Sequence, residues 1–177
     1  MKLYRARIPD IAKKVIEDLV KDGSLEVLPE NRSEAELDLV AVMEEYLRRD
    51  AHLRESVRES MSRRGIPYDR YSKVRSEVAG EMGHPTGNEV ERFLARQFVE
   101  GFMISRFVEE VYGEDGELMK RIRGILESFD VDERAIREEA REKVKNLEEG
   151  TVDYEIALNH AIKEVKKRHG LLVERPR

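Results

Sequence analysis

Apolar residues recur at every third or fourth position along most of the chain, which is the period of a helix that buries one face. Pro9 and Asp10 suit the first turn of a helix, because proline lacks only an amide that is unpaired there and aspartate complements the helix dipole. Gly23 predicts the end of this first helix, 9–22. Its apolar positions are Ile11, Val15, Ile16, Leu19 and Val20.

A longer helix is predicted over residues 33–64. Ser33 and Glu36 have the spacing of a capping box, in which each side chain accepts a hydrogen bond from the other residue's backbone amide. The stripe that follows consists of Leu39, Met43, Tyr46, Leu53, Val57 and Met61. Gly65 predicts the end of this helix, and a shorter helix capped by Asp69 is expected over residues 69–82.

The next predicted helix begins near Asn88 and is strongly apolar. It carries four of the five phenylalanines, so we expect it to be the most buried element. These four are Phe93, Phe98, Phe102 and Phe107. Gly113 and Gly116 predict a kink or a short interruption before the apolar pattern resumes through Leu126.

Two further helices are predicted in the last part of the chain. Asp130 or Asp132 is expected to cap a helix that runs to about Leu147, and Thr151 to cap a final helix over residues 152–168. The inward positions of the final helix are predicted to be Ile156, Leu158, Ile162 and Val165. Residues 171–177 are expected to form a loose tail.

These elements predict an all-α bundle of five or six helices. Residues 25–28 alternate weakly between apolar and polar, which adds a minor short β-ribbon near the N-terminus, with residues 3–5 as the expected partner. We divide the chain into an N-terminal helical half, 1–83, and a C-terminal half, 84–177, which are expected to pack as one unit.

A weak internal echo appears when the chain is shifted by 65 residues. The shift lays Asp50 on Asp115 and matches several neighbouring Glu, Leu and Arg positions. A tandem of two related three-helix halves would explain the echo. Chance matching of amphipathic helices rich in Glu and Arg is the alternative.

The composition supports exposed helices covered with ion pairs. Hydrophobic and charged residues each make up 40% of the 177 residues, and 33 Lys and Arg stand against 38 Asp and Glu. Helical periodicity argues against disorder, which such a charged chain would otherwise suggest. The chain has no cysteine, hence no disulfide and no thiolate nucleophile, and no apolar stretch of signal or membrane-spanning length. We therefore expect a cytoplasmic protein.

Five parts of the sequence carry a family resemblance. They are Lys2-Leu3-Tyr4 with Ile8-Pro9, the segment 46–49, the segment 107–112, the segment 145–151, and the ending 167–171. In this order they resemble a bacterial family known as domain of unknown function 507, and the resemblance spans nearly the whole chain. It implies no activity, cofactor or catalytic residue.

A search for catalytic or metal-binding motifs finds no convergent set. Only Glu81 and His84 have the Glu-x-x-His spacing of a di-iron bundle, and they straddle a glycine at a predicted helix end, so a polar loop histidine is the favoured interpretation. His160 and Glu164 are read as a surface contact. The sequence has no phosphate-binding glycine loop and no nucleophile elbow around a serine. We expect no catalytic residue, metal, cofactor or nucleotide.

Asp50 is the most unusual single residue, because it occupies a place in the stripe between Tyr46 and Leu53 where an apolar side chain is expected. Asp115 holds the matching place after the shift. A carboxylate buried without a partner is costly, so the two could form a polar pair in the core that marks a functional pocket or fixes a packing register. The alternative is that both lie at the rim of the core beside an arginine.

Basic residues gather near both ends of the sequence. They are Lys2, Arg5, Arg7, Lys166, Lys167, Arg168 and His169. On one surface they could contact RNA phosphates, although the net charge of −5 and the lack of interleaved aromatic residues argue against this. Cations near a helix C-terminus also complement the helix dipole. Mixed charge on the phenylalanine-rich helix argues against membrane-surface binding.

The sequence is most consistent with a non-enzymatic interaction or scaffold protein of the bacterial cytosol. Its expected partner is another protein or a second copy of the chain. The alternative is an RNA- or ribosome-associated accessory protein that uses the two basic segments. A carboxylate-based metal enzyme is a third hypothesis, which requires Asp50, Asp115 and several glutamates to converge.

Overall fold

The helical periodicity of the sequence is realised in the computed structural model, which describes residues 1–172. The chain divides into two units, each with its own internal packing. Unit 1 comprises Met1 and residues 8–129, and unit 2 comprises residues 2–7 together with the chain from Asp130 onward. The predicted boundary between residues 83 and 84 falls inside unit 1, because the helices between residues 84 and 129 pack against those that precede them.

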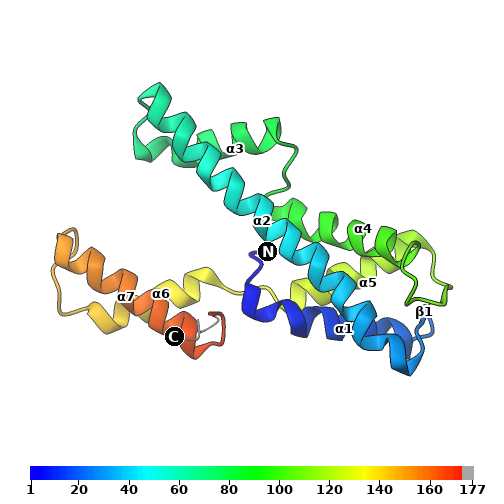
Figure 1. Cartoon of the computed structure of the whole chain (residues 1–177). Helices are drawn as coiled ribbons and strands as arrows, with labels where there is room; N and C mark the ends of the chain where they lie inside the picture. The colour runs from blue at the N-terminus through cyan, green and yellow to red at the C-terminus, as the bar shows by residue number, and fades with distance from the viewer. Residues whose placement is uncertain (173–177) are drawn as a thin grey trace. The chain divides into compact units, whose positions relative to one another are not determined.

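Unit 1 contains five α-helices (Figure 1). They are α1 (Ile8–Lys21), α2 (Arg32–Arg64), α3 (Tyr71–Glu81), α4 (Val90–Phe102) and α5 (Asp115–Ser128). Helices α1 and α4 both contact α2, and α5 contacts α1 and α4. The residues buried on these four helices include Ile11, Ile16, Leu19, Leu39, Met43, Leu94, Phe98, Leu118, Ile122 and Leu126. The predicted inward face of the first helix is therefore confirmed, with Val20 only partly buried.

Helix α2 is 33 residues long and carries the predicted apolar stripe on its buried side. It begins one residue earlier than predicted, after a 3-10 turn at Pro29–Asn31, and Asn31 at the N-cap makes no side-chain cap hydrogen bond. The predicted capping box is therefore wrong, since Ser33 already lies inside the helix. Gly65 ends α2 with a φ of 62°, a left-handed conformation that glycine adopts without a steric penalty.

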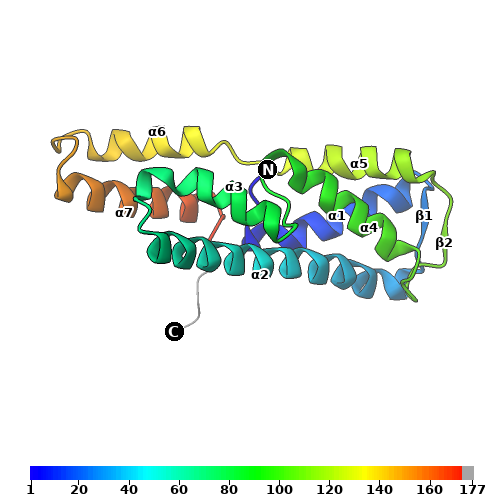
Figure 2. The ribbon, with the colours of Figure 1, turned by 90° about the horizontal axis from the view of Figure 1, so that it is seen from above.

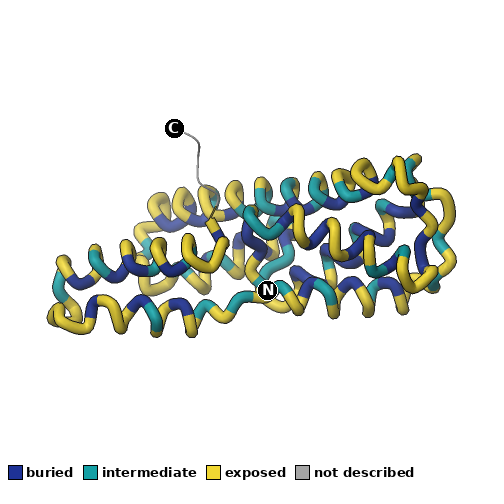
Figure 3. The backbone as a smooth tube through the Cα atoms, turned by 90° about the horizontal axis from the view of Figure 1, so that it is seen from below, coloured by how far each residue is buried: buried dark blue, intermediate teal, exposed yellow. Residues whose placement is uncertain are grey.

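The second half of α2 packs against α3 as an antiparallel hairpin (Figure 2). Leu53 and Val57 of α2 meet Val74 and Val78 of α3 in a buried cluster. The start of α3 also differs from the prediction, because Asp69 lies in a 3-10 turn at Tyr68–Arg70 rather than at a helix cap. Figure 3 shows the resulting pattern, in which buried and exposed residues alternate on opposite sides of each helix.

The phenylalanine-rich segment is interrupted as predicted, but earlier than expected. Helix α4 ends at Phe102, so Phe107 lies outside it. The chain then forms strand β2 (Glu110–Val111), which pairs antiparallel with β1 (Leu25–Glu26), and α5 follows. The predicted β-ribbon is therefore present, but its partner is not the segment 3–5, which packs in unit 2.

The internal echo has no counterpart in the secondary structure. The shift by 65 residues lays Glu45, in the middle of α2, on Glu110 of strand β2. It also lays Asp50, within α2, on Asp115, the first residue of α5. The arrangement of elements does not support a duplication over this stretch.

Unit 2 consists of a helical hairpin, formed by α6 (Glu133–Val144) and α7 (Val152–Arg168), and of the N-terminal segment, residues 2–7. Asp132 caps α6 by accepting hydrogen bonds from two backbone amides, and Thr151 caps α7 by accepting one. Both predicted caps are confirmed. A short 3-10 turn at Arg5–Arg7 follows Tyr4 in the N-terminal segment.

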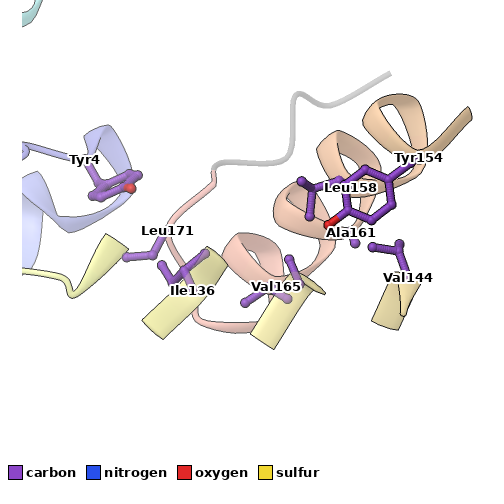
Figure 4. Packing of buried hydrophobic residues seen from close by; sticks show 9 residues of the cluster. Tyr4, Ile136, Val144, Tyr154, Leu158, Ala161, Val165 and Leu171 are labelled. Carbon is purple, nitrogen blue, oxygen red and sulfur yellow. The ribbon is translucent and has the colours of Figure 1, made fainter. Parts of the chain in front are cut away.

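The core of unit 2 is closed at one end by residues from both ends of the chain. Tyr4 and Leu171 lie near Ile136 at this end, Val165 lies in the middle, and Leu158 and Ala161 lie near Val144 farther along the hairpin (Figure 4). Ile156 is 64% exposed, so its predicted inward position is wrong, whereas Leu158 and Val165 are buried as predicted. Leu171 is buried, so the expected loose tail does not begin there. The rest of that expected tail beyond Leu172 lies outside the described residues.

Candidate functional site

Asp50 is the centre of a polar cluster between α2 and α3. Its carboxylate accepts a hydrogen bond of 2.8 Å from Arg75 of α3, and its other oxygen lies 3.6 Å from Arg54 Nε, one helical turn along α2. The side chain of Asp50 is 17% exposed and that of Arg75 is 27% exposed. The aspartate in the apolar stripe is therefore paired, which removes most of the penalty for placing a carboxylate there.

His84 is the most buried polar residue of this cluster, with a side chain that is only 1% exposed. Its Nε2 lies 3.5 Å from Asp50 Oδ1, too far for good hydrogen-bond geometry, and Nδ1 has no hydrogen-bond partner within residues 1–172. One face of the ring stacks on Tyr46 at a centroid distance of 4.9 Å. The predicted polar loop histidine is therefore a buried residue.

The geometry at the C-terminal end of α3 explains why His84 turns inward. Gly83 adopts a φ of 58°, and the His84 amide then donates to the carbonyl of Ala79 at 2.9 Å. This is the Schellman arrangement, in which the residue after the glycine turns back over the last helical turn. Tyr46 fixes the next residue by donating from its hydroxyl to the carbonyl of Pro85 at 3.3 Å.

Burial dominates the electrostatics of the cluster. Burial first and the charge of Asp50 second raise the pKa of Tyr46 to about 12. Burial also lowers the pKa of His84, and the attraction of Asp50 only partly offsets this effect. Burial also disfavours the charged form of Arg75, but the hydrogen bond that Arg75 donates to Asp50 and the charge of Asp50 outweigh this effect and raise the pKa of Arg75. At neutral pH the cluster thus contains an ion pair, a neutral imidazole and a neutral phenol.

Asp115 does not join this cluster. It is exposed in the first turn of α5, where its charge complements the positive end of the helix dipole. The predicted polar pair in the core is therefore wrong for Asp115. The rim alternative describes Asp50 better, since it is partly buried beside an arginine. No local pattern places Arg75 or His84 beside Asp50, because both come from a different segment of the chain.

A pocket of about 530 Å³ adjoins the polar cluster. His84 and Pro85 form one part of its wall, Arg92, Phe93 and Arg96 of α4 form another, and Met119 of α5 closes it. All of these residues belong to unit 1. No local sequence pattern indicated this pocket, because its residues come from several separate segments between Ala79 and Met119.

Metal-binding geometry is not found in the described part of the chain. Within residues 1–172, no three His, Cys, Asp or Glu side chains gather closely enough to hold a metal ion. His84 faces Asp50 rather than Glu81. His160 Nδ1 lies 3.8 Å from Glu164 on an exposed face of α7, which matches the predicted surface contact.

The predicted basic residues are brought together in unit 2. The N-terminal segment with Lys2, Arg5 and Arg7 belongs to the same unit as the C-terminal end of α7, which carries Lys166, Lys167 and Arg168, with His169 next in the chain. Arg7 joins the two by donating to the carbonyl of His169 at 3.1 Å. We call these seven residues the basic surface.

Glu133 organises one side of the basic surface. It lies 3.3 Å from Lys2 Nζ and accepts a hydrogen bond of 3.0 Å from Lys166, while both ammonium groups lie over the ring of Tyr4. Burial and then the charge of Lys166 lower the pKa of Lys2. Burial opposes ionisation of Glu133, but the bonds to the lysines outweigh it and lower its pKa.

Glu139 of α6 organises the other side. It pairs with Arg168 and lies 3.1 Å from His169 Nε2. The side chains of Lys2, Arg168 and His169 are each more than half exposed, whereas Lys166 is only 14% exposed. Glu133 and Glu139 thus lie among the lysines and arginines of the basic surface.

Comparison with known proteins gives one match over nearly the whole chain. A family model described as "Protein of unknown function (DUF507)" matches residues 1–171. No curated protein matches the sequence. In the described residues, no helix is long and apolar enough to cross a membrane.

Proposed function

Because the chain belongs to the DUF507 family, whose description names no activity, we propose its function from its own geometry: it is a non-enzymatic binding protein whose unit 2 contacts the phosphate backbone of RNA. The single observation that carries this proposal is the basic surface. Two segments from opposite ends of the sequence are held together by Tyr4, Leu171 and the Arg7 hydrogen bond.

The charge balance of the basic surface supports a polyanionic partner. Glu133 and Glu139 compensate part of its positive charge and hold the long side chains in place. Lys2 and Arg168 are each paired with one of these glutamates but remain more than half exposed, so a phosphate can reach both side chains. Phosphate contacts from such groups release condensed counterions, which is the main source of affinity in backbone recognition.

Tyr4, the aromatic residue next to the basic surface, supports recognition of the phosphate backbone of RNA rather than of its bases. Tyr4 is only 8% exposed, and the ammonium groups of Lys2 and Lys166 lie over its ring. Base stacking requires an accessible ring face. We therefore expect binding with little sequence preference, driven by charge and sensitive to salt.

The proposal is tested by fluorescence anisotropy of a labelled single-stranded RNA at several salt concentrations. The test variant replaces Lys2, Arg5, Lys167 and Arg168 by glutamine. Since each neutralised phosphate contributes about 0.7 to the slope of log affinity against log salt, loss of four contacts lowers the slope by about 3. The control variant replaces four basic residues of unit 1, Lys13, Lys14, Arg48 and Arg123, which also lie in ion pairs with carboxylates on their own helices.

Equal weakening by the two variants would refute the assignment to unit 2, and absence of RNA binding by the unmodified protein would refute the function itself. A purified protein that carries nucleic acid released by salt would support it.

A second candidate function is binding of a protein partner through unit 1. Ile104 is 86% exposed and Met103 is 55% exposed, beside a pocket of about 440 Å³ lined by Leu39, Phe102 and Phe107. Exposed apolar side chains next to a pocket are typical of protein interaction sites. A crosslinked pull-down that loses a defined partner with Ile104→Asp, and retains it with the four-residue variant of the basic surface, would favour this candidate.

We propose the bacterial cytosol as the place of either interaction. The cysteine-free sequence supports a reducing compartment, where disulfides contribute nothing to stability.

A further inference from the structure

The pocket beside His84 has the shape and lining of a small-molecule site. Its volume of about 530 Å³ lies within the range of ligand pockets, and its walls combine apolar with cationic groups. Phe93 and Met119 are partly buried and supply the apolar part. The pocket lies within unit 1, so nothing about it rests on the proposed basic surface.

Two arginines give the pocket its charge. Arg92 and Arg96 are one helical turn apart on α4, so they project from the same side of the helix, and both line the pocket. Arg96 Nε lies 3.7 Å from Glu100, with both side chains 60% exposed, an arrangement that leaves the guanidinium accessible. Glu89 also lines the pocket, which leaves an excess of one positive charge.

His84 is the second, independent sign of a ligand. The residue is 4% exposed and both ring nitrogens are buried; Nε2 lies 3.5 Å from Asp50 Oδ1, beyond the usual hydrogen-bond distance, and Nδ1 has no hydrogen-bond partner in the described chain. A buried polar atom without a partner costs roughly 1–3 kcal/mol, so native proteins usually provide one. Tyr46 stacks on one face of the ring and Asp50 lies beside Nε2, which fixes the ring in the pocket wall.

We propose that this pocket binds a small organic anion, with its carboxylate or phosphate held by Arg92 and Arg96, its apolar body against Phe93 and Met119, and a polar atom within reach of the His84 ring. Arginine suits this role because its planar group can form two parallel hydrogen bonds to either anion. The apolar wall selects against anions that lack a carbon skeleton.

The experiment follows the backbone amides of the full-length protein by nuclear magnetic resonance during titration with four probes. Benzoate and phenyl phosphate carry both an anion and an aromatic ring, benzyl alcohol lacks the charge, and inorganic phosphate lacks the ring. For about nine non-hydrogen atoms, affinity on the order of 1 mM is expected. Benzoate or phenyl phosphate should shift the amides of residues 83–96 and the His84 ring signals.

Two variants test the role of the arginines. The double change Arg92→Gln and Arg96→Gln should weaken binding about tenfold, since it removes charge-assisted hydrogen bonds. Arg123→Gln is the matched control, because Arg123 lies 3.8 Å from Glu127 at the same helical spacing but outside the pocket. It should leave affinity unchanged.

Three results would each overturn the proposal. The first is that neither aromatic anion shifts residues 83–96. The second is that benzyl alcohol or inorganic phosphate binds as tightly as its aromatic anionic counterpart. The third is that the double variant binds as well as the control.

Discussion

Removal of the Asp50 carboxylate tests whether a partly buried ion pair holds α2, α3 and the following turn together. Asp50→Ala deletes the acceptor of the 2.8 Å hydrogen bond from Arg75 and the carboxylate that lies 3.5 Å from His84 Nε2. Arg75 then remains with a side chain that is 27% exposed and without its partner. The variant is therefore expected to lose stability rather than gain it.

The magnitude follows from burial and geometry. A hydrogen bond to a charged group contributes about 1.5–3 kcal/mol to stability, and the low exposure of both partners limits screening by solvent. We expect Asp50→Ala to lower the free energy of unfolding by about 2 kcal/mol. For a chain of this size, that loss lowers the melting temperature by roughly 4–8 °C.

A double-mutant cycle isolates the pair itself. The free energy of unfolding is measured by urea denaturation for Asp50→Ala, Arg75→Ala and the double variant, and the coupling energy is expected to be about 1.5 kcal/mol. Glu45 and Arg48 form the matched control, because they also lie 2.8 Å apart but are 50% and 75% exposed. Their coupling is expected to be about 0.3 kcal/mol.

Two results would refute this reasoning. Equal coupling in the two cycles would mean that burial of Asp50 has no energetic role. A rise in the melting temperature of an Asp50→Leu variant without aggregation would mean that the stripe prefers an apolar residue there, and that the carboxylate is not needed for packing.

Three further predictions concern His84 and unit 2. His84 has a lowered pKa in the folded state because of burial, so the unfolded chain binds its proton more tightly; the free energy of unfolding should fall as the pH drops below about 6.5, and urea denaturation of His84→Gln should show a flatter profile. An increase in stability on acidification over this range would contradict it. Leu158→Ala should cost about 2–5 kcal/mol because Leu158 is 3% exposed, whereas Ile156→Ala, at a position that is 64% exposed, should stay within about 0.5 kcal/mol, as measured by hydrogen exchange in α6 and α7. Asp132→Ala removes two cap hydrogen bonds of 2.9 and 3.1 Å and should destabilise α6 by about 1 kcal/mol by the same measurement; unchanged protection of the first turn would show that the cap is dispensable.

Local signals were sufficient for most helices. Thr151 and Asp132 cap their helices as predicted, because a side-chain cap depends only on residues two or three positions away. The apolar stripe of α2 is buried at every predicted position. The all-α class and the small β-ribbon follow from such local patterns.

Features that depend on distant segments could not be predicted in this way. Strand β1 pairs with β2 rather than with residues 3–5, because the N-terminal segment packs in unit 2. Ser33 has the right spacing for a cap, but the preceding 3-10 turn already starts the helix at Arg32. Ile156 lies two positions before Leu158, which is about 200° around the helix, so the hairpin with α6 that buries Leu158 leaves Ile156 exposed.

In the candidate sites, too, local sequence patterns indicated single residues, whereas the contacts between segments depend on the fold. The members of the basic surface were predicted from composition at the two chain ends, and their joining depends on Tyr4 and Leu171, whose burial no local pattern indicated. Asp50 was found because it breaks an apolar stripe, which is a local signal. Its neighbours Arg75 and His84 come from α3 and the turn after it, so only the fold brings them together.

The most direct test of the proposed function is to map the contact surface on the full-length protein. Backbone amide shifts are recorded by nuclear magnetic resonance as a short single-stranded oligouridylate is added at low salt. If unit 2 contacts RNA phosphates through the basic surface, the largest shifts fall in residues 2–7 and 166–169 and disappear as salt is raised. Shifts confined to unit 1, or the absence of any shift, would contradict it.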